Sequence, residues 1–164
     1  MILGMTTLTF IHVLISLIGI GAGFIVALGL LTSNRLKSWT ALFLLTTVLT
    51  SVTGFFLPAD HLKPSHVVGI ISLVVLAIAL YALYARNMQG AWRWIYVGSA
   101  VLALYLNVFV LIAQAFLKIE QLKDLAPTGS EPPFLLTQGV VLVVFILIGI
   151  AAIVRFRPGA LSRF

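Results

Sequence analysis

Two histidines occur in or beside long apolar segments, where an ionisable side chain is costly and marks a candidate functional site. His12 lies inside the run from Phe10 to Phe24, and His66 follows Pro64 at the start of another run. A neutral imidazole between membrane helices is able to ligate the iron of a b-type haem or to hydrogen-bond the head group of a quinone. The sequence therefore predicts a cofactor-binding site where the two rings lie at one depth and face the protein.

Amide and hydroxyl side chains accompany the histidines at a similar depth in the other apolar segments. Asn107 and Gln114 are seven residues apart, so they share one stripe of a helix. Interhelical hydrogen bonds of such groups stabilise membrane bundles by about 0.6–2 kcal/mol each, which gives every one of them a purely structural interpretation as well. The candidate cofactor-binding residues are His12, Thr53, His66, Gln114 and Gln138.

The first apolar run also shows which way His12 points. At about 100° per residue, His12 and Ser16 fall on the same helix face as Gly19 and Gly23. These two glycines form a GxxxG pair, the spacing that lets helices approach closely in lipid. We therefore expect this face to pack against other helices and His12 to face the protein.

The composition is that of a membrane protein. Of the 164 residues, 62% are hydrophobic and 9% are charged, whereas soluble domains average about 25% charged residues. The chain has no cysteine, which excludes disulfides, cysteine metal sites and thiol oxidoreductase chemistry. The net charge of +6 comes from basic residues spread singly or in pairs between apolar runs, which argues against a nucleic-acid partner.

Five runs are long and apolar enough to predict membrane-spanning helices. They are Thr7–Leu31, Trp39–Leu57, Ser65–Ala85, Trp94–Leu117 and Phe134–Val154. We expect residues 1–164 to form a single all-α domain, an integral membrane bundle of five transmembrane helices. The fourth helix is predicted to continue beyond the membrane to about Lys123.

The distribution of charge predicts the orientation of this bundle. With five spans, seven of the ten Lys and Arg residues fall on one side and three on the other. Cytoplasmic loops carry the excess of Lys and Arg, so the N-terminus is predicted to be periplasmic and the C-terminus cytoplasmic. The seven are Arg35, Lys37, Arg86, Arg93, Arg155, Arg157 and Arg163, and the three are Lys63, Lys118 and Lys123. The four acidic residues, Asp60, Glu120, Asp124 and Glu131, fall on the periplasmic side.

Several classes of activity lack the residues that they need. No Asp or Glu lies inside a predicted span, which argues against a proton-coupled carrier. The chain has no GxSxG or HExxH motif, so hydrolase chemistry is disfavoured.

Three stretches carry a resemblance to a known group of proteins: TSVTGFF at residues 50–56, PSHVVGI at 64–70 and SEPPF at 130–134. They resemble stretches of small proteobacterial inner-membrane proteins that carry no assigned activity. The resemblance implies a location in the bacterial inner membrane. In size and histidine placement the chain is also similar to haem- or quinone-binding membrane anchor subunits.

These observations lead to one expected function and two alternatives. The first is a non-catalytic, multi-pass inner-membrane protein that serves as an accessory or assembly subunit, with lipid and other membrane subunits or further copies of itself as partners. Its candidate contact surface is the segment 118–133. The first alternative is a redox subunit that binds haem b or a quinone near His12 and His66. The second is a small channel or carrier that functions as an oligomer.

Overall fold

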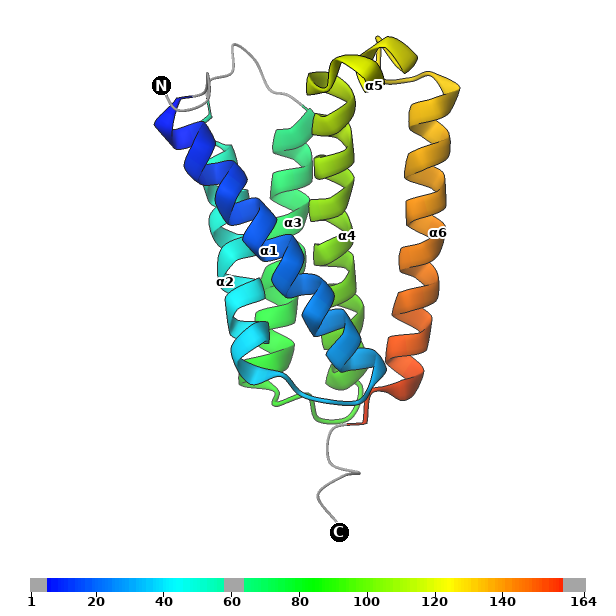
Figure 1. The fold of residues 1–164 in the computed structure, drawn as a ribbon. Helices are drawn as coiled ribbons and strands as arrows, with labels where there is room; N and C mark the ends of the chain where they lie inside the picture. Colours follow the sequence, from blue (N-terminus) through cyan, green and yellow to red (C-terminus); the bar gives the residue numbers. More distant parts are fainter. Residues whose placement is uncertain (1–5, 58–63, 158–164) are drawn as a thin grey trace.

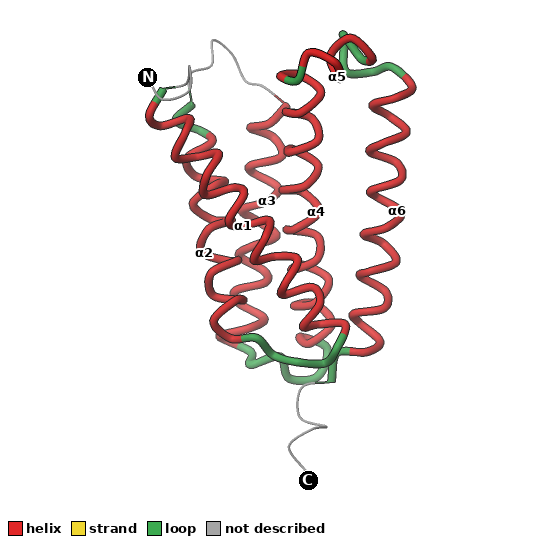
Figure 2. The backbone as a smooth tube through the Cα atoms, in the orientation of Figure 1, coloured by secondary structure: helices red, strands yellow, loops and turns green. Residues whose placement is uncertain are grey.

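The computed structural model describes residues 6–57 and 64–157, and every regular element in these two ranges is helical. The elements are α1 (Thr7–Leu31), α2 (Lys37–Gly54), α3 (Pro64–Leu80), the π-helical turn η1 (Tyr81–Ala85), α4 (Trp92–Lys118), α5 (Glu120–Leu125) and α6 (Pro132–Arg155). Figure 2 shows the same helices joined by short loops. The prediction of an all-α fold is confirmed.

Four of these segments are long and apolar enough to cross a membrane: α1, α3 together with η1, α4, and α6. This is the build of a multi-pass membrane protein. Helix α2 does not belong to this group in the part of the chain that the structure describes. Its 18 residues include Lys37 and seven Ser or Thr residues, which lower its hydropathy.

The five long helices stand side by side and alternate in direction along the chain (Figure 1). We call the end at which α1, α3 and α6 begin the upper end, as drawn in Figure 1, and the opposite end the lower end. Helix α4 is central and packs against α1, α3 and α6. Helix α6 lies at one edge and packs against α4 and α1. Helix α1 runs obliquely across the bundle and packs most extensively on α2.

Glycines set the point at which α1 comes closest to its neighbours. A Cβ atom on Gly19 would lie 2.9 Å from Thr46 Oγ1, and one on Gly23 would lie 2.5 Å from the Leu104 side chain and 2.9 Å from Phe43. All three distances are too short for a larger residue, so the predicted packing role of the GxxxG pair is confirmed. Below this crossing the inward-facing side chains of the neighbouring helices are buried, as Ala79, Ala82 and Val97 illustrate at 0% exposure.

The fourth helix ends earlier than the sequence predicts. Helix α4 stops at Lys118, Ile119 has an extended backbone with φ −89° and ψ 116°, and a separate short helix, α5, begins at Glu120. The turn directs the chain over the upper end toward the start of α6 (Figure 1), and Ala126 is buried there at 2% exposure. A straight continuation to Lys123 would have led the chain away from the bundle instead.

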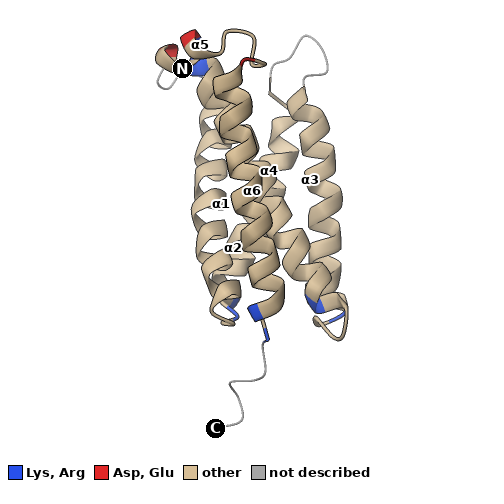
Figure 3. Ribbon diagram, turned by 90° about the vertical axis from the view of Figure 1, so that its right-hand side faces the viewer, with Lys and Arg blue, Asp and Glu red and all other residues tan. Residues whose placement is uncertain are grey.

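Charged residues are divided between the two ends (Figure 3). The upper end carries Lys118, Lys123 and three acidic residues, Glu120, Asp124 and Glu131. Of the charged residues that the structure describes, those at the lower end are all basic, namely Arg35, Lys37, Arg86, Arg93, Arg155 and Arg157. Asp60, Lys63 and Arg163, which contribute to the predicted orientation, lie outside the described residues.

Candidate ligand-binding site

A cavity of about 390 Å³ lies in the upper half of the bundle, between α1, α2, α3 and α4. Its volume falls at the lower end of the range of about 300–1,000 Å³ that is usual for small-molecule sites. The wall is mainly apolar, with Val13, Leu17, Leu106 and Leu111 among its members. The polar side chains on it are Thr9, His12, Ser16, Thr50, Ser51, Ser65, His66, Ser72, Asn107, Gln114 and Lys118.

The cavity exists because α1 leans away from α4 above the glycine crossing while it stays in contact with α2. Gly19 and Gly23 bring α1 into close contact with α2 and α4, and Ile20 forms part of the cavity wall between them. Above that level, Figure 1 shows the start of α1 displaced to the side of α4. His12 and Ser16 lie on this diverging part, on the same face as the glycines.

His12 is held by a side chain behind it. Its Nδ1 lies 2.8 Å from Thr53 Oγ1, and Thr53 Oγ1 lies 2.7 Å from the carbonyl oxygen of Leu49. A carbonyl oxygen only accepts, so the single hydroxyl hydrogen of Thr53 is donated to Leu49, as is common for threonine in helices. Nδ1 then carries the proton and donates to Thr53, and Nε2 is left with its lone pair. Thr53 does not line the cavity but orients the ring that does.

His66 lies on the same cavity, in the first turn of α3. Its ring stacks on Phe55, with 5.7 Å between ring centroids and an angle of 23°. Gly69 makes room for this stack, since a Cβ atom there would lie 3.3 Å from Phe55 Cζ. The two imidazoles therefore face one shared cavity from two helices, as the sequence predicts.

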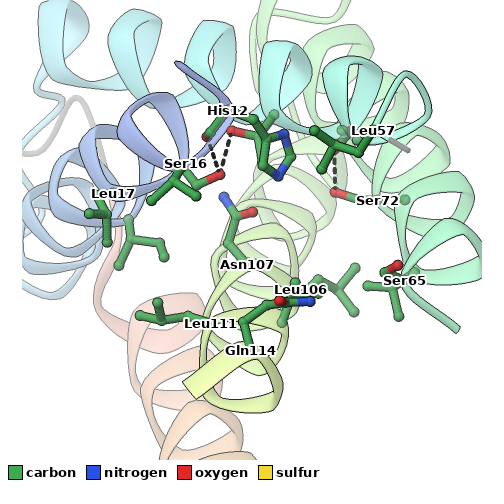
Figure 4. Close-up of a pocket in the computed structure, with 18 of the residues that line it drawn as sticks. His12, Ser16, Leu17, Leu57, Ser65, Ser72, Leu106, Asn107, Leu111 and Gln114 are labelled. Atoms are coloured by element: carbon green, nitrogen blue, oxygen red, sulfur yellow. Dashed lines mark hydrogen bonds between the residues drawn. The ribbon is translucent and has the colours of Figure 1, made fainter. Parts of the chain in front are cut away.

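Helix α4 supplies the amide groups of the cavity. Asn107 Nδ2 donates to Thr47 Oγ1 at 3.3 Å, which leaves Asn107 Oδ1 as an acceptor. Figure 4 shows Asn107 reaching from α4 toward the side of the cavity where His12 and Ser16 lie. The Ser16 hydroxyl donates to the carbonyl oxygen of His12 at 2.7 Å. Gln114 lies two turns above Asn107, and Lys118 stands one turn higher still, at the upper end of α4.

Gln138, the fifth candidate residue, is not part of this cavity. It lies on α6 and faces α4, where its Nε2 donates to the carbonyl oxygen of Phe109 at 3.1 Å. Its side chain is buried at 7% exposure, and Oε1 has no hydrogen-bond partner among the described residues. One side of α4 lines the cavity and another contacts α6, so polar residues at a similar height on α4 and α6 do not meet.

The sequence gives an incomplete list of the polar groups on this cavity. Asn107 is seven residues from Gln114, so the two share one face of the helix, and this spacing indicates that Asn107 also lines the cavity. Ser51 donates to the carbonyl oxygen of Thr47 at 2.9 Å and contacts Ser72 Oγ at 3.2 Å. Single serines in apolar runs occur throughout the chain, so no sequence signal singles out Ser51 or Ser72.

The described residues contain no cluster of three or more His, Cys, Asp or Glu side chains that could hold a metal ion. Comparison with known proteins finds no matching family model, curated protein or solved structure. The interpretation of the cavity therefore depends on its own geometry.

Proposed function

We propose that this chain is a multi-pass membrane protein that binds a lipid-soluble molecule with a quinone-type ring in the cavity of its upper half. The observation that carries the proposal is the convergence of three polar side chains, His12, Asn107 and Gln114, on a mainly apolar space of about 390 Å³. An apolar pocket with a few directed hydrogen-bonding groups is the usual form of a site for a small organic ligand.

The position of the cavity supports entry from the lipid. Leu17 on α1 and Leu111 on α4 both line the cavity, and both are exposed on the outside of the bundle, at 49% and 40%. At this height the outside of a membrane bundle is hydrocarbon. A ligand with an isoprenoid tail would place its ring between α1 and α4 and leave the tail among the lipids.

We also propose that all five long helices cross the membrane. Helices α1 and α3 run in the same direction, so α2 has to return the chain between them (Figure 1). Its length of about 27 Å is close to the hydrocarbon thickness of about 30 Å. Its outward side chains are apolar, including Leu45 at 59% exposure, whereas Thr46, Thr47 and Ser51 are buried inside the bundle.

The basic lower end supports a cytoplasmic location for that end in a bacterial inner membrane. Single-cysteine variants test this orientation, because the natural chain has no cysteine. We expect a membrane-impermeant maleimide to label Lys123→Cys in intact cells and to label Gln89→Cys only after the cells are broken. The reverse pattern would contradict the orientation.

A pair of matched substitutions tests the binding site. Val110 lines the cavity, whereas Val140 is exposed on α6 at 56%. We expect Val110→Trp to fill the cavity and to abolish the retention of a decyl-substituted benzoquinone by protein-containing nanodiscs, measured against empty nanodiscs. Val140→Trp should retain it as the natural chain does. If the natural chain retains neither the quinone nor its reduced quinol above the level of empty nanodiscs, the proposed function is wrong.

Haem b is the second candidate ligand. The observation that favours it is the presence of two imidazoles, His12 and His66, on different helices around one cavity, since two histidines are a common axial pair for haem iron. The protein purified from its own membrane would then show a Soret band that shifts on reduction with dithionite. A colourless sample would leave only the quinone-type ligand.

An accessory role in a larger membrane complex stays a prediction that is compatible with ligand binding. Purification in mild detergent should then yield a stoichiometric partner. A channel or carrier finds less support, because the lower half of the bundle is closed by buried side chains such as Phe43, Leu76 and Leu104.

A further inference from the structure

Two atoms on the cavity, one on α1 and one on α4, are hydrogen-bond acceptors. His12 Nδ1 donates to Thr53, so Nε2 is the acceptor of a neutral ring. Asn107 Nδ2 donates to Thr47, so its Oδ1 is an acceptor as well. Neither acceptor has a hydrogen-bond donor among the residues that the structure describes.

Two acceptors recognise a ligand that donates. A quinol carries ring hydroxyl groups, each with a hydrogen to give, whereas the carbonyl oxygens of the oxidised quinone only accept. With the quinone bound, the lone pairs of Nε2 and Oδ1 would face carbonyl lone pairs and stay without partners in an apolar pocket, which is unfavourable.

We infer that the cavity binds the reduced, hydroxyl-bearing form of its ligand in preference to the oxidised quinone, and that Thr53 sets this preference by fixing the tautomer of His12. The inference rests on the proposed function and specifies which redox form the site takes. His12 and Asn107 are the binding residues, and Thr53 is a positioning residue because it acts through the His12 ring. Gln114 and Lys118, farther toward the upper end, also line the cavity and carry N–H groups that can donate to a second oxygen of the ligand.

One hydrogen bond gained or lost to a buried group changes affinity by about tenfold. For a two-electron couple, a tenfold preference for the quinol raises the midpoint potential of the bound ligand by about 30 mV. The site would therefore favour the presence of quinol even in a partly oxidised membrane pool.

The experiment compares the retention of decyl-substituted benzoquinone and of its reduced quinol by nanodiscs that contain the full chain, under anaerobic conditions. We expect the natural chain to bind the quinol about tenfold more tightly. Thr53→Val removes the acceptor of the Nδ1 proton and should reduce the preference to about twofold or less. Thr53→Ser keeps the hydroxyl and should preserve the preference.

Thr137→Val is the matched control for this substitution. Thr137 donates to the carbonyl oxygen of Pro133 one turn earlier at 2.7 Å, as Thr53 does with Leu49, but it lies on α6 and does not line the cavity. The preference for quinol should be unchanged in this variant.

An independent readout comes from the imidazole nitrogen resonances of His12 in the natural chain, assigned with a His12→Gln variant. They should show a neutral ring protonated at Nδ1. This measurement is made on the natural chain, so it does not require that Thr53→Val folds. A ring protonated at Nε2 overturns the inference. Equal binding of both forms, or tighter binding of the quinone, also overturns it but leaves the proposed function intact, whereas retention of neither form overturns the proposed function.

Discussion

The upper and lower halves of the bundle are built from the same five helices but differ in how these helices meet. In the lower half, Gly23 sits directly against Phe43 and Leu104, and Ala79 and Ala82 have no exposed surface. In the upper half, α1 and α4 separate and enclose a cavity of about 390 Å³. The glycines of α1 bring the helices together in the lower half, whereas α1 diverges from α4 in the upper half.

The difference indicates where this fold has room for function. Lipid offers no hydrophobic force that draws helices together, so close packing of small residues has to supply much of their attraction. The upper half gives up part of that packing and contains hydrogen-bonding side chains instead, such as His12, Asn107 and Gln114. A binding site needs half-buried polar side chains around an open space, whereas a purely structural bundle does not need them.

The largest expected effect concerns the glycine crossing. A Cβ atom at position 23 would lie 2.5 Å from Leu104 Cδ1, and both Leu104 and Phe43 are buried at 1% exposure and have little freedom to move. We expect Gly23→Ala to lower the free energy of unfolding by about 1–3 kcal/mol through overpacking. Thermal unfolding in a mild detergent measures the loss.

Gly21→Ala is the matched control, since a Cβ atom there would meet nothing within 4 Å. Alanine is the better helix former, so this variant should be as stable as the natural chain or up to about 1 kcal/mol more stable. Equal effects of the two substitutions would show that the close approach at Gly23 does not hold the lower half together.

The sequence predicts the packed half better than the open half. The GxxxG spacing is a local pattern, and the structure gives it the expected role at Gly19 and Gly23. The grouping of His12, His66 and Gln114 also follows from helix faces and depth. Gln138 has the right depth but the wrong neighbours, because a single sequence does not show which helices are adjacent. The break at Ile119 carries no glycine or proline signal, and it depends on where the chain has to turn to reach α6.

Substitutions of two glutamines, one outside the cavity and one on its wall, should have effects of intermediate size. Gln138 Oε1 is buried without a described partner, and an unsatisfied buried oxygen costs about 1–3 kcal/mol. We therefore expect Gln138→Leu to raise the free energy of unfolding by about 1 kcal/mol, after the loss of the bond to Phe109 is included.

Gln114→Leu should affect ligand retention and leave the stability nearly unchanged. Gln114 lines the cavity, and its removal should change the stability by less than about 0.5 kcal/mol while it weakens the retention of decyl-substituted benzoquinone. Stability and retention are measured on both variants in the same nanodiscs. A clear loss of stability in Gln138→Leu would mean that Oε1 is satisfied by a bound water, and unchanged retention in Gln114→Leu would remove this residue from the site.

The smallest expected effect is a difference in pH dependence between the hydrogen bonds at the two ends of the bundle. At the upper end, the Glu131 carboxylate accepts hydrogen bonds from the Thr128 backbone N–H at 3.0 Å, the Thr128 hydroxyl at 2.8 Å and the Ser130 backbone N–H at 3.0 Å. At the lower end, the backbone N–H of Arg157 donates to Ser33 Oγ at 2.7 Å. The first set depends on an ionised carboxylate, and the second involves no group that titrates in acid.

Partial desolvation of the Glu131 carboxylate raises its pKa, but the hydrogen bonds from Thr128 and Ser130 outweigh this and lower the pKa from 4.5 to about 2. Because the folded pKa is the lower one, the stability that the carboxylate gives the loop is fully present above pH 4.5 and is lost as the pH falls through about 2. The amide resonances of Thr128 and Ser130 should therefore shift with a midpoint near pH 2, while that of Arg157 stays constant. In Glu131→Gln the loop amides should not titrate. A midpoint near pH 4.5 in the natural chain would show that the hydrogen bonds to Glu131 do not hold the loop. The upper end would then have no counterpart of the Ser33–Arg157 hydrogen bond at the lower end.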